Sequence, residues 1–302
     1  MTVALDQAAT DAYYDATTIL VPEDGDDLDA AEIQTALQKL SRRVQHSRGA
    51  AWGTLAWTGT MAVSGTAAAP VVVLGAIESC PLRDSSNVWR PYYTTGESTL
   101  GASNVEGGGS LTADTWYYVY AWSDSVAPTA VKFQISTTPP TTALLPTVPR
   151  LWKRGEDANY RYLGAFYAGT SGDPRPVRCA RGQYTYRASA LAFPTINADT
   201  VAIAWADTSL VTVLPPHARM ALIRCEVESL DVADNAMLEL RTKGDTASLI
   251  PIRAGFAPST TATEGDINTV VVEIETDSAQ AIQRQVTGTA PNTSIVAHGW
   301  RE

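Results

Sequence analysis

The stretch that decides the fold is "SLTADTWYYVYAW", residues 110–122, which contains five aromatic residues within seven positions. Alternate side chains of a β-strand point to opposite faces of its sheet. Trp116, Tyr118 and Tyr120 therefore share one face, while Tyr117 and the residues that alternate with it occupy the other. A strand with two bulky faces is typical of a protein interior, where tyrosine and tryptophan find partners for their polar atoms. The pattern predicts a buried strand rather than an exposed aromatic surface.

The next apolar stretch, "AVKFQIS", extends this prediction to a pair of strands. Val131, Phe133 and Ile135 alternate onto one face, and the intervening "SDSVAPT" is typical of a hairpin loop. We therefore expect a β-hairpin with aromatic packing across its two strands.

The rest of the chain supports a mainly β fold. After Gly49 the apolar residues alternate with period two, and clusters of Gly, Pro, Ser and Thr separate short strands without intervening helices. This spacing favours antiparallel β-sandwich or barrel domains, preceded by one short N-terminal α-helix. Composition changes again near Ser189, so we predict three regions. They are an N-terminal arm and helix (1–49), a middle β domain (50–188) and a C-terminal β-sandwich (189–302).

The predicted helix lies in "PEDGDDLDAAEIQTALQKLSRRVQHSRG", residues 22–49. Asp29 followed by Glu32 resembles a capping box at its start. An apolar stripe with spacings of 4, 3 and 4 follows: Ile33, Leu37, Leu40 and Val44. A coiled coil needs about 3 or 4 heptads, so this helix is too short to hold one together alone. It either associates with copies of itself, as an oligomerisation helix, or lies against its own domain.

Charge and composition exclude several partners. The net charge is -10, so the basic surface that nucleic-acid binding requires is missing overall. The longest apolar run, "APVVVLGAI", is far shorter than the roughly 20 residues that span a bilayer, so we expect no membrane insertion. Cys80, Cys179 and Cys225 are odd in number and widely separated, which predicts buried thiols rather than disulfides or a zinc site. These features indicate assembly in a reducing cytoplasm.

The usual catalytic patterns are missing from the sequence. It contains no G-x-S-x-G, P-loop, G-x-G-x-x-G or H-E-x-x-H motif. His46, His217 and His298 lie in three different predicted segments, so we expect no catalytic residues, metal site or cofactor, and no enzymatic activity. One alternative stays open, because two of the 32 acidic residues brought together by the fold could hydrolyse a polysaccharide.

An aromatic cluster in "NVWRPYY" is the candidate ligand contact. Trp89, Tyr92 and Tyr93 could stack on sugar rings if they are exposed. The alternative is that the three rings pack at a strand end beside Pro91.

Three motifs in the middle region, taken in order, resemble a segment of tail fibres and related appendage proteins of tailed bacteriophages. They are "LTADTWYYVYAW", "ISTTPP" and "YRYLGAFYAGTSGDPRPV", which together cover residues 111–177. The N-terminal "VPEDGDDLDAAEIQTALQKL" is also similar to the start of some phage fibre and virion proteins. No motif of this family occurs after Ser189.

The resemblance implies a non-enzymatic virion structural protein, a homotrimeric tail fibre or short spike that is assembled in the host cytoplasm. Its N-terminal region would attach to other virion proteins, and its C-terminal domain would contact the host surface, including a cell-surface glycan. Two alternatives remain: a head decoration or head fibre protein of the capsid, and a polysaccharide depolymerase spike.

Overall fold

The computed structural model confirms a mainly β chain. It describes residues 59–77, 80–84, 86, 89–127, 129–143, 151–155, 157–180, 182–187, 194–229, 236–254, 267–288 and 291–301. Within these residues the strands pair antiparallel throughout, and the helical content is one short 3₁₀ turn, η2 (Ala102–Asn104). No helix in this part of the chain is long and apolar enough to cross a membrane. The predicted helix with Ile33, Leu37, Leu40 and Val44 lies outside the described residues.

The largest sheet has nine strands. Its order is β18 (Ile267–Glu275), β15 (Met220–Ser229), β20 (Pro291–Arg301), β12 (Gln183–Tyr186), β11 (Val177–Ala180), β1 (Thr60–Gly65), β2 (Pro70–Leu74) and β5 (Ser98–Leu100), with β13 (Thr195–Asp199) also paired to β20. In β15, the alternate residues Ala221, Ile223, Cys225 and Val227 are all buried, as their period-two spacing predicts.

Two smaller sheets and a hairpin complete the fold. One sheet has the order β7 (Lys132–Ser136), β6 (Thr115–Trp122), β10 (Asp157–Ala168), β9 (Leu151–Arg154) and β8 (Pro140–Ala143). The other has the order β14 (Ile203–Ser209), β19 (Ala281–Thr287), β16 (Met237–Thr242) and β17 (Ile250–Arg253), and the hairpin joins β3 (Cys80–Arg83) to β4 (Trp89–Tyr92).

The aromatic strand predicted from residues 110–122 is β6, and it lies inside the protein. Tyr117 on one face and Tyr118 and Tyr120 on the other are each at most 3% exposed. β6 pairs with β7 as the predicted hairpin and with β10 on its other side. The prediction of a sheet interior is therefore confirmed.

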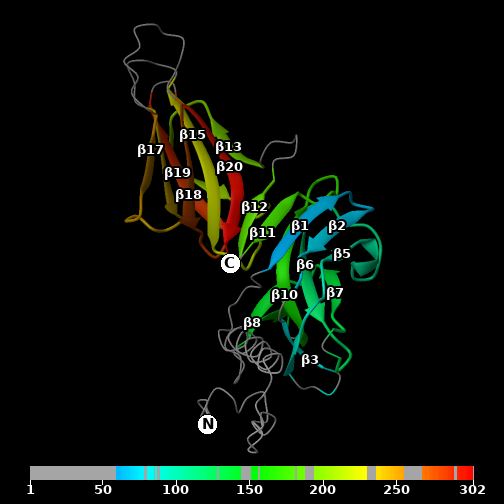
Figure 1. Cartoon of the computed structure of the whole chain (residues 1–302). Coiled ribbons are helices and arrows are strands. Elements are labelled where there is room, and N and C mark those ends of the chain that lie inside the picture. The colour runs from blue at the N-terminus through cyan, green and yellow to red at the C-terminus, as the bar shows by residue number, and fades with distance from the viewer. Residues whose placement is uncertain are drawn as a thin grey trace, which may run out of the picture.

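The nine-stranded sheet runs through both strand-rich regions of the chain. Figure 1 shows β1, β2, β6 and β10 in one group and β13, β15, β17 and β19 in the other, with β11, β12 and β20 between them. β12 pairs with the C-terminal strand β20, which in turn pairs with β15. Backbone hydrogen bonds thus cross the predicted boundary near Ser189, and the division into a middle and a C-terminal domain stays a prediction.

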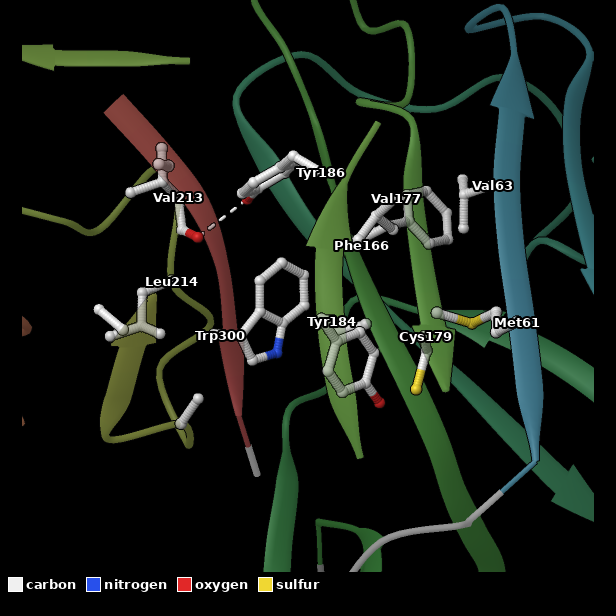
Figure 2. Packing of buried hydrophobic residues seen from close by; sticks show 14 of the residues in the cluster. Met61, Val63, Phe166, Val177, Cys179, Tyr184, Tyr186, Val213, Leu214 and Trp300 are labelled. Carbon is white, nitrogen blue, oxygen red and sulfur yellow. Dashed lines mark hydrogen bonds between the residues drawn. The ribbon is translucent and has the colours of Figure 1, made fainter. Parts of the chain in front are cut away.

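The core continues across the same place. Trp300 of β20 is fully buried and stacks on Tyr184 of β12, with ring centroids 4.5 Å apart and planes 7° apart. Figure 2 shows Met61, Phe166 and Cys179 packed beside this pair. One hydrophobic cluster therefore includes residues from both groups of strands.

Candidate functional site

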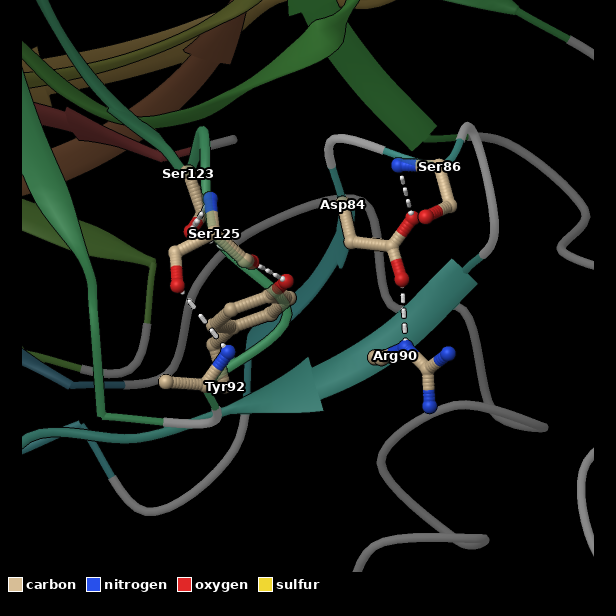
Figure 3. Close-up of polar contacts among 7 residues, drawn as sticks. Asp84, Ser86, Arg90, Tyr92, Ser123 and Ser125 are labelled. Atoms are coloured by element: carbon tan, nitrogen blue, oxygen red, sulfur yellow. Dashed lines mark hydrogen bonds and ion pairs between the residues drawn. The ribbon is translucent and has the colours of Figure 1, made fainter.

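The structure corrects the predicted sugar contact at Tyr92. Its side chain is 0% exposed, and its hydroxyl donates a hydrogen bond to the backbone oxygen of Ser125 (Figure 3). A ring that packs under a neighbouring turn has no free face for a sugar. Tyr93 is 38% exposed and stays a candidate on exposure alone. The side chain of Trp89, which begins β4, lies outside the described residues.

The loop between β3 and β4 is held by a buried carboxylate. Asp84 accepts hydrogen bonds from the backbone nitrogen of Ser86 at 2.8 Å and from Nε of Arg90 (Figure 3). The Asp84 carboxylate is fully buried, whereas the Arg90 side chain is 45% exposed. The hydrogen bond to Asp84 raises the pKa of Arg90. These contacts fix the ends of the loop, so their role is structural.

The aromatic side chains of β6 make contacts within the core. Tyr118 and Tyr120 both lie against Tyr162 of β10, at centroid distances of 6.4 and 6.0 Å. The Tyr162 hydroxyl lies 3.0 Å from Nε2 of His217. His217 therefore belongs to the packing of these sheets, as a residue with a polar partner inside an aromatic cluster.

A short loop, residues 211–214, is the place where side chains from distant strands converge. We call it the junction loop. Four successive carbonyl oxygens accept hydrogen bonds from four side chains: Trp116 to Val211 (2.8 Å), Arg175 to Thr212 (2.7 Å), Tyr186 to Val213 (2.8 Å) and Gln280 to Leu214. The first three donors belong to the middle region and lie between 27 and 95 residues away from their acceptors. The loop ties the two strand groups together a second time, beside the β12–β20 pairing.

Burial and ring stacking hold these donors against the junction loop. Tyr186 is 3% exposed, and desolvation raises the pKa of its hydroxyl well above the ordinary range. It therefore stays protonated and keeps donating to Val213, as Figure 2 shows. Arg175 also lies over the ring of Tyr167, with its guanidinium carbon 4.7 Å from the ring centroid. This site could not be predicted from the sequence, because nothing in the pattern of residues 211–214 marks their carbonyls as acceptors.

Among the described residues, no group of three or more His, Cys, Asp or Glu side chains could hold a metal ion. Cys80, Cys179 and Cys225 are buried, and none of the three takes part in a disulfide. Burial raises the pKa of the Cys225 thiol to about 12, so it carries almost no reactive thiolate near neutral pH.

Comparisons with known proteins leave the chain without an assigned family. No family model matches the sequence, and no curated protein is similar to it at a significant level. Among solved structures, it is similar to a tryptic core variant of Cry1Da from Bacillus thuringiensis, with 10% sequence identity and a TM-score of 0.22. The matched region covers 82% of this chain and 52% of that one, so the chain spans about half the length of this structural neighbour. A similarity this distant carries no argument about function.

Proposed function

We propose that the chain is a non-enzymatic structural protein of a bacteriophage virion, a homotrimeric tail fibre or short spike. In this proposal the N-terminal region attaches to other virion proteins, and the C-terminal strands, arranged as a β-sandwich, face the host surface. The three ordered motifs of residues 111–177 support the class of protein, since they resemble a segment of phage fibres.

The observation that carries the proposal is the continuity of the framework between the two strand groups. An appendage that contacts a cell has to transmit force along its length without yielding at a joint. Here the joint contains the β12–β20 hydrogen bonds, the stacked pair of Tyr184 and Trp300, and the three side chains of the middle region that bind the junction loop. Domains joined by a flexible linker would move relative to one another by default, whereas this connection resists bending.

The oligomeric state is the first test of the proposal. Light scattering of the purified full chain is expected to give three times the chain mass of 32.2 kDa. Mass spectrometry of purified particles is expected to detect the chain, and immunogold labelling is expected to mark their tails. A monomer that no particle contains would overturn the proposal. Labelling of capsids instead of tails would replace the tail fibre with a head decoration or head fibre protein.

Cleavage of a polysaccharide would distinguish a depolymerase spike from these structural proteins. Incubating the purified protein with host capsule or lipopolysaccharide is expected to leave the polymer length unchanged. Shortened chains, or a halo around plaques, would show that a pair of carboxylates acts as a hydrolase.

A further inference from the structure

The outer face of the four-stranded sheet carries an ordered set of polar side chains around a tryptophan. Leu238 and Leu240 of β16 and Ile282 and Val286 of β19 are buried on the inner face. The residues that alternate with them therefore point outward. We call this surface the outer face and define it by Trp205, Asp207, Glu239, Arg241, Lys243, Gln283 and Gln285.

An irregularity in β14 places Trp205 on the outer face. Ile203 pairs with Val286, and Ala206 pairs with Arg284. Two residues of β14, Ala204 and Trp205, therefore lie opposite the single β19 residue between Val286 and Arg284. Such a bulge redirects side chains along the bulged strand. In an unbroken strand Ile203 and Trp205 would share a face. With the bulge, Ile203 packs against the core while Trp205 contacts Arg241 on the opposite side.

In one row of the outer face, the side chains already contact one another. The Arg241 guanidinium lies 3.9 Å from the centroid of the Trp205 ring, and its Nε donates to Oε1 of Gln283 at 2.9 Å. Gln283 donates in turn to Asp207 at 3.0 Å, and Lys243 forms an ion pair with the same carboxylate at 2.5 Å. Each long side chain is thus held in one orientation before any ligand arrives, which lowers the entropy cost of binding.

The neighbouring row keeps its hydrogen-bonding capacity. Glu239 and Gln285 lie directly opposite each other, and Glu239 pairs on its other side with Pro251 of β17, which is exposed. Within the described part of the chain, no hydrogen bond joins the Glu239 or Gln285 side chain to another residue, and Arg241 donates a hydrogen bond through Nε. The carboxylate of Asp245 also acts electrostatically on Arg241. A carboxylate, an amide and a guanidinium therefore surround the partly exposed indole.

Charge and hydrogen-bond chemistry select the kind of ligand. The two cations of the outer face, Arg241 and Lys243, are matched by Asp207 and Glu239, and the carboxylates of Asp245 and Asp277 also act electrostatically on Arg241 and Lys243. The outer face therefore has no excess of positive charge that would attract a polyanion. A sugar hydroxyl both donates and accepts, and it can satisfy Glu239 and a neighbouring amide together. The apolar face of a sugar ring can pack against the indole.

Stability alone gives little reason for this arrangement. Asp207 and Lys243 keep 48% and 39% of their side-chain surface exposed, and ion pairs this exposed contribute little to stability. Ordering several long side chains costs entropy of similar size. A network that orders side chains beside unused donors and acceptors is more useful for recognition than for folding.

We propose that the outer face binds an uncharged saccharide through Trp205, Glu239, Arg241 and Gln285. This inference rests on the proposed function, because a glycan on the host surface is the partner that a virion appendage would meet. It moves the predicted glycan contact from the β3–β4 hairpin, where Tyr92 is buried, to the group of strands at the C-terminal end of the chain.

The test measures binding of the full chain to a panel of purified bacterial surface polysaccharides, uncharged O-polysaccharides and anionic teichoic acids included. At least one uncharged polysaccharide is expected to bind, with an affinity that changes less than twofold when NaCl rises, because no net charge is involved. Trp205→Ala and Glu239→Gln are each expected to weaken binding about tenfold or more.

Trp122→Ala is the matched control. Trp122 also lies beside a cation, Lys132 at 5.0 Å, which pairs with Asp124, but this set lies on the five-stranded sheet. Its loss is expected to leave binding unchanged. Thermal unfolding of each variant checks folding, and Glu239→Gln changes no packing, so it remains informative if Trp205→Ala is unstable. Binding to no uncharged polysaccharide, or equal binding by wild type, Trp205→Ala and Glu239→Gln, would overturn the inference.

The saccharide site and the virion role can be refuted independently of each other. A trimer found on particles that binds no uncharged polysaccharide would overturn the saccharide site and leave the structural role intact. A monomer absent from particles that binds an uncharged polysaccharide through Trp205 would overturn the virion role and leave the site intact.

Discussion

Replacing Gly299 with alanine tests whether the close approach of β12 and β20 holds the two strand groups together. A methyl group on Gly299 would lie 1.8 Å from the carbonyl oxygen of Tyr184 and 2.8 Å from its carbonyl carbon. It would also lie 3.1 Å from the Cα atom of Thr185. All three are backbone atoms of β12, so no side-chain rotation relieves the overlap, and the strands have to separate.

The magnitude follows from what separation breaks. β12 and β20 share three registered residue pairs, and the rings of Tyr184 and Trp300 stack across them at 4.5 Å. Losing two backbone hydrogen bonds costs about 2 kcal/mol in total. Losing the ring stack costs about 1 kcal/mol more. We therefore expect Gly299→Ala to lower the free energy of unfolding by about 3 kcal/mol.

Urea denaturation followed by circular dichroism and by tryptophan fluorescence measures this loss. Gly96→Ala is the control, because a methyl group there meets nothing within 4 Å and the backbone of Gly96 does not have a positive φ. The control is expected to change stability by less than about 0.5 kcal/mol. A loss below about 1 kcal/mol for Gly299→Ala would refute the reasoning, since the two strands could then not lie as close as the structure places them.

Three further predictions concern buried polar groups. Tyr186→Phe is expected to destabilise the protein by about 1 to 3 kcal/mol, because a buried carbonyl of the junction loop loses its donor; urea denaturation measures it, and Tyr93→Phe, an exposed residue, is expected to cause no change. Burial raises the pKa of Cys225 from an ordinary value of 9.0 to about 12, so the folded state holds this proton longer than the unfolded state does. As pH rises between those two values, the free energy of unfolding of the wild type should fall by up to about 1.4 kcal/mol per pH unit more than that of Cys225→Ala. Parallel curves of unfolding free energy against pH would contradict this. Arg284→Met is expected to cost about 3 kcal/mol, because it leaves the charge of Asp199 with only the hydrogen bond from Asn197 and with only 12% of its side chain exposed. Adding Asp199→Asn should recover part of that loss, and a fully additive double-mutant cycle would argue against the pairing.

The strands and their buried faces could be predicted where a local pattern determines them. β6 and β15 have alternation strong enough to define which side chains are inside, and both predictions are confirmed by the burial of Tyr120 and Cys225. The β6–β7 hairpin follows from a short loop between two such strands. In each case the decisive contacts join residues close in sequence.

The contacts that shape the junction could not be predicted, because they join residues far apart. Trp116 donates to a carbonyl 95 residues later in the chain, and alternation says nothing about that partner. The same reason explains why the sequence left two alternatives open at Tyr92. An aromatic residue at a strand end is exposed or buried according to what covers it, and its cover is a turn 33 residues further along.

The bulge in β14 shows why the outer face also escaped the sequence analysis. A period-two pattern assigns Ile203 and Trp205 to one face, so a single strand would have to expose the isoleucine or bury the tryptophan. Exposing Ile203 forfeits about 1.5 to 3 kcal/mol of burial, and burying Trp205 requires a partner for its N–H group. The one-residue bulge avoids both costs. Departures from regular alternation are expected at functional surfaces, and in β14 the departure places a partly exposed indole beside the polar side chains of the outer face.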